Sequence, residues 1–426
     1  MDLFSKFKKD YFNYLISIIL PALISGLSIP VFKNLLGARG YGKFSIWLNA
    51  ILILTAVLSG WITQSIIRLF PGSANKHSFS RGAIVLSIQT QLIFFLPVFI
   101  VCWYISHDII LAALCSLILI TTCLQFTILP VIQSSFLSKK IITSETIRIF
   151  SYVGLAVLLL KLTGISYLYS LFIAVIVSYS LSLAYLIKQA INFFREMDTL
   201  KKNEPTHNLF KSFFKYGAPL SLWFIFSYLF TYIDKLFMFH YLGAEAQGNY
   251  QAIFDLLYKS IALIISPVIT SLFPILTSAY EKGDKADIRK FLKKIIIYEL
   301  SGFAVVSILY WWFGADLLLF VLKTPNTYSF RLMGFIVICG TFIWQLAILA
   351  QKRFELQFKT FYLLVMAAIT FLIQVIFYLL FKDYQDNQLL YPLGFLLSSF
   401  IYLLLISFTE LLSFSKKIRL QRKILK

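Results

Sequence analysis

Few ionisable side chains lie within the long apolar stretches of this sequence, and these few could bind an ion or a charged ligand. Asp234 and Lys235 are neighbours near the end of one stretch, and Asp255 and Lys259 lie four residues apart in the next. A spacing of four places Asp255 and Lys259 on one face of a helix, where they can form an ion pair. A charged group inside a bilayer costs about 2.5–3.5 kcal/mol on insertion scales, so such groups tend to face a partner, water or a ligand.

The sequence leaves two possible roles open for each of three of these residues. Asp234 is either a carboxylate that binds a coupling ion or latches two parts of the protein, or one that pairs with a neighbouring helix, for instance through Lys259. Lys235 either extends its charged end toward the membrane interface or contacts a substrate. Lys259 is a partner for Asp255 or a cation for an anionic ligand.

Two arginines in the first half of the chain are further candidates. Arg68 and Arg148 lie near the ends of two other apolar stretches. A guanidinium group binds phosphate through two parallel hydrogen bonds, so both residues suit a ligand that carries phosphate. Anchoring at the membrane interface is the alternative, and Arg148 can also pair with Glu145, three residues earlier.

The composition shows which elements must position these residues. Hydrophobic residues make up 59% of the 426 residues, charged residues only 14%, and the mean hydropathy is +0.81. Soluble domains contain about 25% charged residues, so this chain requires the bilayer as its solvent. The sequence predicts an all-α polytopic membrane protein.

The net charge of +20 does not indicate a nucleic-acid partner. Lysine and arginine lie in short links between apolar stretches, without a zinc-finger spacing or another nucleic-acid signature. The four histidines are scattered, and the four cysteines lie inside apolar stretches without paired spacing. We therefore expect no metal site, no disulfide framework and no bound cofactor.

Twelve apolar stretches are long enough to cross a bilayer, since a spanning helix needs about 20 residues. They are 11–33, 44–67, 83–105, 109–135, 145–163, 166–188, 214–241, 247–277, 294–314, 327–350, 359–382 and 388–413. The longest link, at 189–213, contains a proline and a charge cluster. The predicted organisation is a six-helix lobe at 1–188, a linker at 189–213, a second six-helix lobe at 214–413 and a basic tail at 414–426.

The distribution of positive charge predicts the orientation. Most of the 39 lysines and arginines lie in every second link, counted from the N-terminus, and in the C-terminal tail. Because positive charge collects on the cytoplasmic side, both termini are expected to be cytoplasmic. The aromatic run at 310–313 then falls at the outer interface, where aromatic side chains concentrate.

The two halves of the chain resemble each other at an offset of 206 residues. "LLGARGYGKF" (35–44) aligns with "YLGAEAQGNY" (241–250), with glycines matched at both ends of the block. These glycines permit positive φ and predict a tight outer turn between the first two helices of each half. The positions that match Asp234 and Asp255 are Ser28 and Asn49, so the charge asymmetry lies in the second half.

These blocks carry a family resemblance. "IDKLFMFHYLGAEAQGNY" (233–250) and "SPVITSLFPILTSAYEKGD" (266–284) resemble the second half of bacterial polysaccharide flippases, and "LLGARGYGKFSIWL" resembles their first half. These are O-antigen (Wzx-type) flippases of the multidrug/oligosaccharidyl-lipid/polysaccharide (MOP) exporter superfamily. The resemblance covers nearly the whole chain, and its loose apolar motifs identify the family better than the substrate.

The resemblance implies two pseudo-symmetric six-helix lobes around a central cavity in the bacterial inner membrane. It implies a monomer, with no enzymatic activity, that moves an oligosaccharide on undecaprenyl diphosphate from the cytoplasmic to the periplasmic leaflet by alternating access. Membrane lipid and other polysaccharide-assembly proteins are the further partners it implies, and coupling to H⁺ or Na⁺ is left open.

Two other functions fit the sequence less well. A membrane polysaccharide polymerase or glycosyltransferase usually needs a sizeable outer loop or an interfacial cluster of acids, arginine or histidine, and the outer links here are short. A small-molecule or cation exporter of the same superfamily would favour an acidic cavity. The basic candidates Lys235, Lys259, Arg68 and Arg148 instead favour an anionic cargo.

Overall fold

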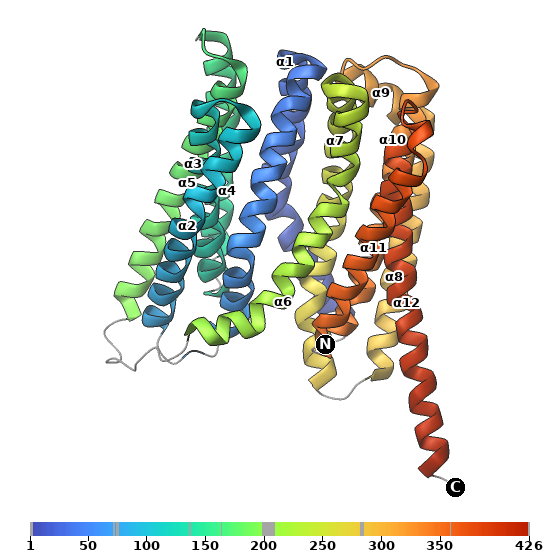
Figure 1. The fold of residues 1–426 in the computed structure, drawn as a ribbon. Coiled ribbons are helices and arrows are strands. Elements are labelled where there is room, and N and C mark those ends of the chain that lie inside the picture. The colour runs from blue at the N-terminus through green and yellow to red at the C-terminus, as the bar shows by residue number, and fades with distance from the viewer. Residues whose placement is uncertain are drawn as a thin grey trace. The chain divides into compact units, whose positions relative to one another are not determined.

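The computed structural model describes residues 3–70, 73, 76–135, 138–162, 164–197, 209–281, 285–357 and 359–424. In these residues all regular structure is helical (Figure 1). The α-helices are α1 (Leu3–Leu69), α2 (Lys76–Ser106), α3 (Ile109–Ser134), α4 (Ser138–Leu162), α5 (Tyr167–Met197), α6 (Leu209–Phe230), α7 (Ile233–Glu281), α8 (Lys285–Leu309), α9 (Ala315–Val321), α10 (Tyr328–Leu356), α11 (Thr360–Leu380) and α12 (Leu390–Ile424). A π-helical turn at Tyr310–Gly314 joins α8 to α9, and a 3₁₀ turn at Lys382–Tyr384 follows α11.

Two of these helices are too long to cross a bilayer once. α1 has 67 residues and α7 has 49, and each contains a single non-helical glycine, Gly37 or Gly243. Each helix runs to one end of its part of the molecule, bends and runs back (Figure 1). Gly37 has φ 68° and Gly243 has φ 82°, a region that other residues avoid. A tight turn between the first two helices of each half is therefore confirmed, although Gly42 and Gly248 lie in regular helix and the side of the membrane stays a prediction.

The bends explain how the predicted twelve spans relate to the observed helices. Ten stretches of the described residues are long and apolar enough to span a membrane. Two of them, Gly26–Leu69 and Phe210–Ile265, contain 44 and 56 residues and each holds parts of two predicted spans. The all-α polytopic fold with about twelve membrane helices agrees with the prediction.

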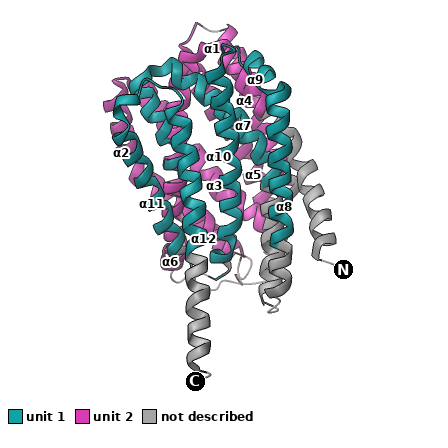
Figure 2. Cartoon of the chain, turned by 90° about the vertical axis from the view of Figure 1, so that its right-hand side faces the viewer, with its two compact units in different colours: residues 1–16, 229–426 teal, residues 17–228 magenta. Residues whose placement is uncertain are grey.

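The chain divides into two compact units (Figure 2). Unit 1 comprises residues 1–16 and 229–426, and unit 2 comprises residues 17–228. The predicted lobe boundaries stay predictions, because residues 198–208 of the predicted linker lie outside the described residues. The boundary between the two compact units lies between residues 228 and 229, near the end of α6, and not within the predicted linker. The side chains of the predicted tail and of the 266–284 motif also lie outside the description.

Within unit 2, α3 and α5 pack on each other, α2 packs on α3, and α4 packs on α5. One apolar cluster joins the end of α1 to the beginnings or ends of four other helices. It consists of Ile62, Ile66, Phe70, Phe79, Ala83, Ile128, Val131, Ile132, Leu183, Leu186, Ala190 and Phe213. Ser65 Oγ also donates to the Phe213 carbonyl at 3.0 Å, which ties α1 to the first part of α6. In unit 1, α10 packs against α7 and α12, and α11 packs against α12.

The bend glycines give a first testable prediction. A side chain added at Gly37 or Gly243 would meet no atom within 4 Å, so alanine there is opposed only by the positive φ. We expect either substitution to destabilise the protein by about 1–2 kcal/mol. Gly154, in the interior of α4, has equally open surroundings, and Gly154→Ala should be neutral or stabilising by up to about 1 kcal/mol. Thermal unfolding of the purified variants in detergent measures the difference, and equal effects at all three sites would contradict the explanation.

The start of α3 gives a prediction on pH. Asp108 caps this helix by accepting hydrogen bonds from the Ile110 and Leu111 N–H groups at 2.9 and 3.1 Å. The hydroxyl of Tyr169 also donates to its carboxylate, and this bond, followed by the backbone bonds, lowers the pKa of Asp108 below its usual 3.8. A lowered pKa means that the stabilisation is complete above about pH 4 and is lost as the pH falls through the folded-state value.

We therefore expect Asp108→Ala to cost about 1 kcal/mol at neutral pH, the usual value of a lost helix cap. Asp108→Asn retains a capping oxygen and should lose less, while abolishing this part of the acid dependence. Unfolding measured between pH 3 and pH 7 tests both variants. A wild type and an alanine variant that differ equally at both ends of this range would refute the linkage.

Candidate functional site

The most unusual site in unit 1 begins at a break in a membrane helix. The predicted span 214–241 is not continuous, because α6 ends at Phe230 and α7 begins at Ile233. Thr231 and Tyr232 form the turn between them, so backbone carbonyls near the turn lose their regular helical partners. In a bilayer such groups must be satisfied by the protein itself. Asp234 and Lys235 follow immediately and supply this need.

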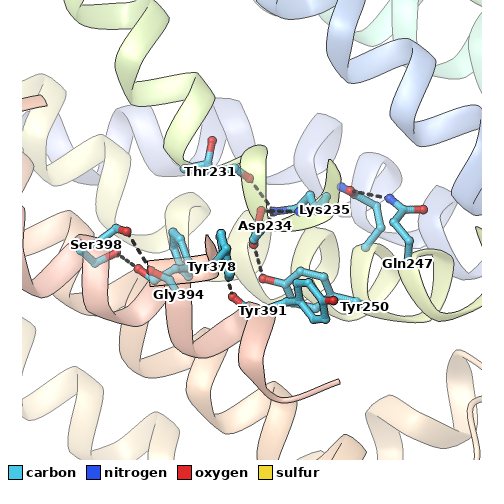
Figure 3. Close-up of polar contacts among 12 residues, drawn as sticks. Thr231, Asp234, Lys235, Gln247, Tyr250, Tyr378, Tyr391, Gly394 and Ser398 are labelled. Atoms are coloured by element: carbon cyan, nitrogen blue, oxygen red, sulfur yellow. Dashed lines mark hydrogen bonds and ion pairs between the residues drawn. The ribbon is translucent and has the colours of Figure 1, made fainter. Parts of the chain in front are cut away.

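The two side chains form a closed set of polar contacts (Figure 3). Lys235 Nζ donates to the Thr231 carbonyl at 2.5 Å and to Asp234 Oδ1 at 3.1 Å. The other carboxylate oxygen, Asp234 Oδ2, accepts from the Tyr250 hydroxyl on the second arm of α7. The N–H of Lys235 donates to Asp234 Oδ1 at 2.8 Å. The ion pair therefore connects the break, the first arm and the second arm of α7.

Aromatic rings enclose the cation of this site. Lys235 Nζ lies 3.4 Å from the centroid of the Phe254 ring and 5.2 Å from that of Tyr250. A desolvated ammonium group over a ring gains about 2 kcal/mol or more from the ring quadrupole. We call Thr231, Asp234, Lys235, Tyr250 and Phe254 the Asp234 cluster.

The burial of the cluster corrects two expectations. Asp234 is 0% and Lys235 1% exposed, so Lys235 does not extend toward the interface. The ion-pair partner of Asp234 is the adjacent Lys235 and not Lys259. The break explains both results, because it places a carbonyl within reach of Lys235 and turns the adjacent side chains toward each other.

A second layer of buried tyrosines stands behind the cluster. Tyr378 on α11 donates its hydroxyl hydrogen to the Tyr391 carbonyl at 3.0 Å. Its ring stacks with Phe237, with centroids 5.0 Å apart. Gly394 on α12 leaves room for it, since a side-chain carbon there would lie 2.0 Å from the Tyr378 hydroxyl. The contacts of Tyr378 with Phe237 and with Tyr391 thus join α7, α11 and α12.

Asp255 and Lys259 lie five and nine residues after Tyr250, on the second arm of α7. Lys259 Nζ is 3.9 Å from Asp255 Oδ1, so the predicted pair forms. The side chains are 50% exposed for Lys259 and 19% for Asp255, in contrast to the buried Asp234 cluster. Asp255 also acts electrostatically on Lys235, which links this pair to the cluster. Lys259 is the candidate of unit 1 that a cargo could reach.

In unit 2, Arg148 lies deeper in its helix than expected. The span was predicted to begin at 145, whereas α4 begins at Ser138, so Arg148 is ten residues, or about 15 Å, from the start of the helix. Its Nε and Nη2 atoms donate to Glu145 Oε2 at 3.0 and 2.6 Å, which confirms the predicted pair. Gln125 on α3 donates to the other oxygen of Glu145 at 3.0 Å. The guanidinium lies 5.0 Å from the centroid of the Tyr179 ring on α5.

The Arg148 side chain is nevertheless 23% exposed. A charged group at this depth cannot face hydrocarbon cheaply, so its exposed part indicates a water-filled surface. Its contacts with Glu145 use one edge of the guanidinium, and the side chain retains further N–H donors. Arg68 is different: it lies in the last turn of α1, is exposed, and is not brought together with Arg148 by any described contact.

Two further charges are buried. Lys33, the last residue of the predicted span 11–33, is buried in α1 just before the bend. Glu299, in α8, is 7% exposed, and neither of its carboxylate oxygens has a hydrogen-bond partner among the described residues. Hydropathy could not reveal either burial, because the hydropathy value of a charged residue near the end of a span is the same whether the residue faces water or protein. No group of three His, Cys, Asp or Glu side chains in the described part of the chain is arranged to hold a metal ion.

Comparisons with solved structures identify the fold. An inward-facing multidrug resistance MATE family transporter of the MOP superfamily superposes with a TM-score of 0.68 at 12% identity, over 93% of this chain and 94% of that one. A MOP superfamily transporter from Pyrococcus furiosus, described as having a binding pocket of reverse polarity, gives 0.68 at 12% identity over 97% and 96%. An outward-facing MATE family transporter gives 0.60 at 13% identity over 95% and 96%. At such identities the likeness establishes the fold alone.

The comparison with family models gives the family. No curated protein matches the sequence significantly. The model of a family described as polysaccharide biosynthesis proteins matches residues 7–280, which is more than half of the 426 residues. The chain therefore belongs to the polysaccharide biosynthesis protein family and has the fold of the MOP superfamily transporters.

Proposed function

We propose that this protein is a flippase that moves a lipid-linked oligosaccharide, carried on undecaprenyl diphosphate, from the cytoplasmic to the periplasmic leaflet of the bacterial inner membrane. Sugars and a diphosphate cannot cross hydrocarbon unaided, so they need a polar path with cations for the phosphates. Transport requires alternating access of the cargo to the two leaflets, and it requires no covalent step. An O-antigen repeat unit is a cargo of this class.

The single observation that carries the proposal is the partly exposed Arg148 at membrane depth. The family match and the fold of the protein leave polysaccharide export and small-molecule export as alternatives. Between residues 17 and 190 the only carboxylates are Asp108 and Glu145. Asp108 lies outside the spans at the start of α3, and Glu145 is already engaged by Arg148 and Gln125. This part of unit 2 therefore offers an anionic cargo a cation and offers a cationic drug no unpaired carboxylate.

The proposed orientation follows from the distribution of lysine and arginine over the links between the spans. With both termini cytoplasmic, the basic links face the leaflet in which the lipid-linked cargo is made. The proposed unit of function is a monomer that works with membrane lipid and with other proteins of polysaccharide assembly. A gradient of H⁺ or Na⁺ would supply the energy for transport, and the proposal does not choose between the two ions.

Deletion of the gene in its host tests the function. We expect undecaprenyl-linked oligosaccharide to accumulate on the cytoplasmic leaflet, measured as sugar accessible to a glycosidase in inside-out vesicles and protected in spheroplasts. Wild-type protein should restore export, and Arg148→Gln should not. Normal surface polysaccharide in the deletion strain, where no second flippase is encoded, would falsify the proposal. Increased sensitivity to cationic drugs with unchanged glycolipid would favour the exporter instead.

A further inference from the structure

Arg148 has an internal competitor for an anionic cargo. Glu145 lies three residues earlier on α4, and its Oε2 atom accepts from Nε and Nη2 of the guanidinium at 3.0 and 2.6 Å. A carboxylate and a phosphate bind a guanidinium in the same way, through the N–H donors of one edge. Glu145 therefore occupies an edge of Arg148 that a phosphate would use.

This ion pair can open. The Arg148 side chain is 23% and the Glu145 side chain 26% exposed, whereas the pair of Asp234 and Lys235 in unit 1 is buried. A partly exposed ion pair contributes little to stability, so another anion can separate its members. The pair is thus a contact that a cargo can exchange and not a fixed part of the core.

Neighbouring helices hold the carboxylate in place while the arginine is exchanged. Gln125 on α3 donates from Nε2 to Glu145 Oε1 at 3.0 Å, and Gln125 is only 3% exposed. The hydroxyl groups of Ser144 on α4 and Ser182 on α5, both buried, lie 2.6 Å apart and form a hydrogen bond. These contacts tie α4 to α3 and to α5 at the position of the carboxylate. When an anion takes the guanidinium, Glu145 therefore stays beside it.

One carboxylate dominates the charge around this guanidinium in unit 2. Asp108 is the other carboxylate between residues 17 and 190, and it precedes α3, seventeen residues or about 25 Å from Gln125. On α5 the first acidic residue after Tyr179 is Glu196, again seventeen residues further along the helix. The negative charge beside the guanidinium is therefore that of its own helical partner.

Two anions at one guanidinium repel each other. At a separation of about 5 Å in a partly buried site, the repulsion is several times the thermal energy. A diphosphate must therefore displace Glu145 or bind against its charge, and in both cases it binds less tightly than it would to Arg148 alone. A transport site requires such a limit, because a ligand that is bound too tightly does not leave.

We propose that Glu145 is the residue that releases the cargo. It competes with the phosphate for Arg148 and returns to the guanidinium as the cargo leaves, and Gln125 keeps it in position for this return. The inference rests on the proposed function, since it takes a lipid diphosphate as the cargo. It adds that one ion pair sets both the affinity for the cargo and the rate of its release.

Glu145→Gln tests the exchange, because it removes the charge and keeps the size of the side chain and an oxygen for Gln125. The probe is farnesyl diphosphate, which carries the diphosphate of the proposed cargo on a shorter chain, and farnesol is the neutral comparison. In calorimetric titrations of the full-length protein in detergent, we expect the variant to bind the diphosphate about tenfold more tightly than the wild type. Farnesol should bind to both proteins alike.

Export should change in the opposite direction. We expect Glu145→Gln to export less polysaccharide per amount of protein in the membrane, because the cargo leaves more slowly. A misfolded variant would lose both binding and export, so tighter binding with lower export identifies the exchange. Full export by a variant that binds more tightly would overturn the role in release.

Two further variants test the mechanism. Asp108→Asn is the matched control, because it removes the same charge from unit 2 far from the guanidinium and keeps a capping oxygen. It should leave affinity and export unchanged. The double variant Glu145→Gln, Arg148→Gln should show no gain in affinity over Arg148→Gln, since the competition needs the guanidinium. The same gain in both backgrounds would overturn the inference.

The titrations also separate this inference from the proposed function. If the wild type prefers farnesyl diphosphate to farnesol and Glu145→Gln binds it no more tightly, the inference fails and the proposed cargo stands. If neither the wild type nor the variant prefers the diphosphate, the cargo is not a lipid diphosphate, and the inference is overturned together with the proposed function.

Discussion

Asp234→Ala is expected to destabilise the protein by about 3–5 kcal/mol, because it leaves the ammonium group of Lys235 buried without its counterion. Lys235 is 1% exposed, and among the described residues its side chain contacts the Asp234 carboxylate, the Thr231 carbonyl and two aromatic rings. The Tyr250 hydroxyl would lose its acceptor at the same time. Thermal unfolding of the purified variant in detergent measures the loss.

The double variant Asp234→Asn, Lys235→Met distinguishes two causes of the loss of stability. One cause is the buried ammonium group left without its counterion, and the other is the lost hydrogen bond to Tyr250. The double variant removes both charges and keeps an oxygen for Tyr250, so it should recover most of the stability. Asp255→Asn is the matched control on the same helix, since the Asp255–Lys259 pair is 3.9 Å long and half-exposed at Lys259. An exposed pair is worth about 0–1 kcal/mol. Equal losses in Asp234→Ala and Asp255→Asn would contradict the assignment.

Transport by the double variant decides between the two roles of Asp234. The Asp234 cluster is closed by its own contacts and connects the two arms of α7, so we expect transport to return with stability. A stable double variant without transport would instead assign Asp234 or Lys235 to ion coupling or to cargo. Lys259→Ala should leave stability nearly unchanged, because half of that side chain is exposed. Loss of transport in this variant would therefore identify Lys259 as a contact for the cargo.

Arg148→Gln is expected to lower oligosaccharide export at least roughly tenfold, since a charge-assisted hydrogen bond to phosphate contributes about 1.5–3 kcal/mol. The expected effect on stability is small by comparison. Glu145 is itself 26% exposed and keeps its hydrogen bond from Gln125 when the arginine is removed. The measurement is surface polysaccharide in the complemented deletion strain, normalised to the amount of protein in the membrane.

Two controls accompany this variant. Arg148→Lys keeps the charge but loses the planar fork, so it should recover part of the export. Lys161→Gln removes an exposed cation from the last turn of the same helix and should have no effect. Full export by Arg148→Gln would return Arg148 to a structural role as the partner of Glu145, and it would remove the observation on which the proposed cargo rests.

The sequence was sufficient for the architecture because the bilayer allows few solutions. Long apolar stretches must be helices, and the repeated glycine block had to be a turn, since φ values of 68° and 82° are accessible at little cost only to glycine. The same residues, at an offset of 206, form the same bend in both halves. Spacing alone also predicted the pairs Glu145–Arg148 and Asp255–Lys259, because they lie three and four residues apart on a helix.

The environment of the charges depended on contacts between residues far apart in the chain. No proline near Phe230 indicates the helix break in the sequence, yet this break directs Lys235 to the Thr231 carbonyl. Tyr250 reaches Asp234 from the second arm of α7. Hydropathy reports how many charges a span contains, whereas burial, partner and water access depend on which helices pack around each charge. The sequence therefore determined the helices, the bends and the family, and only the tertiary structure decided that Asp234 is enclosed and that Arg148 remains accessible.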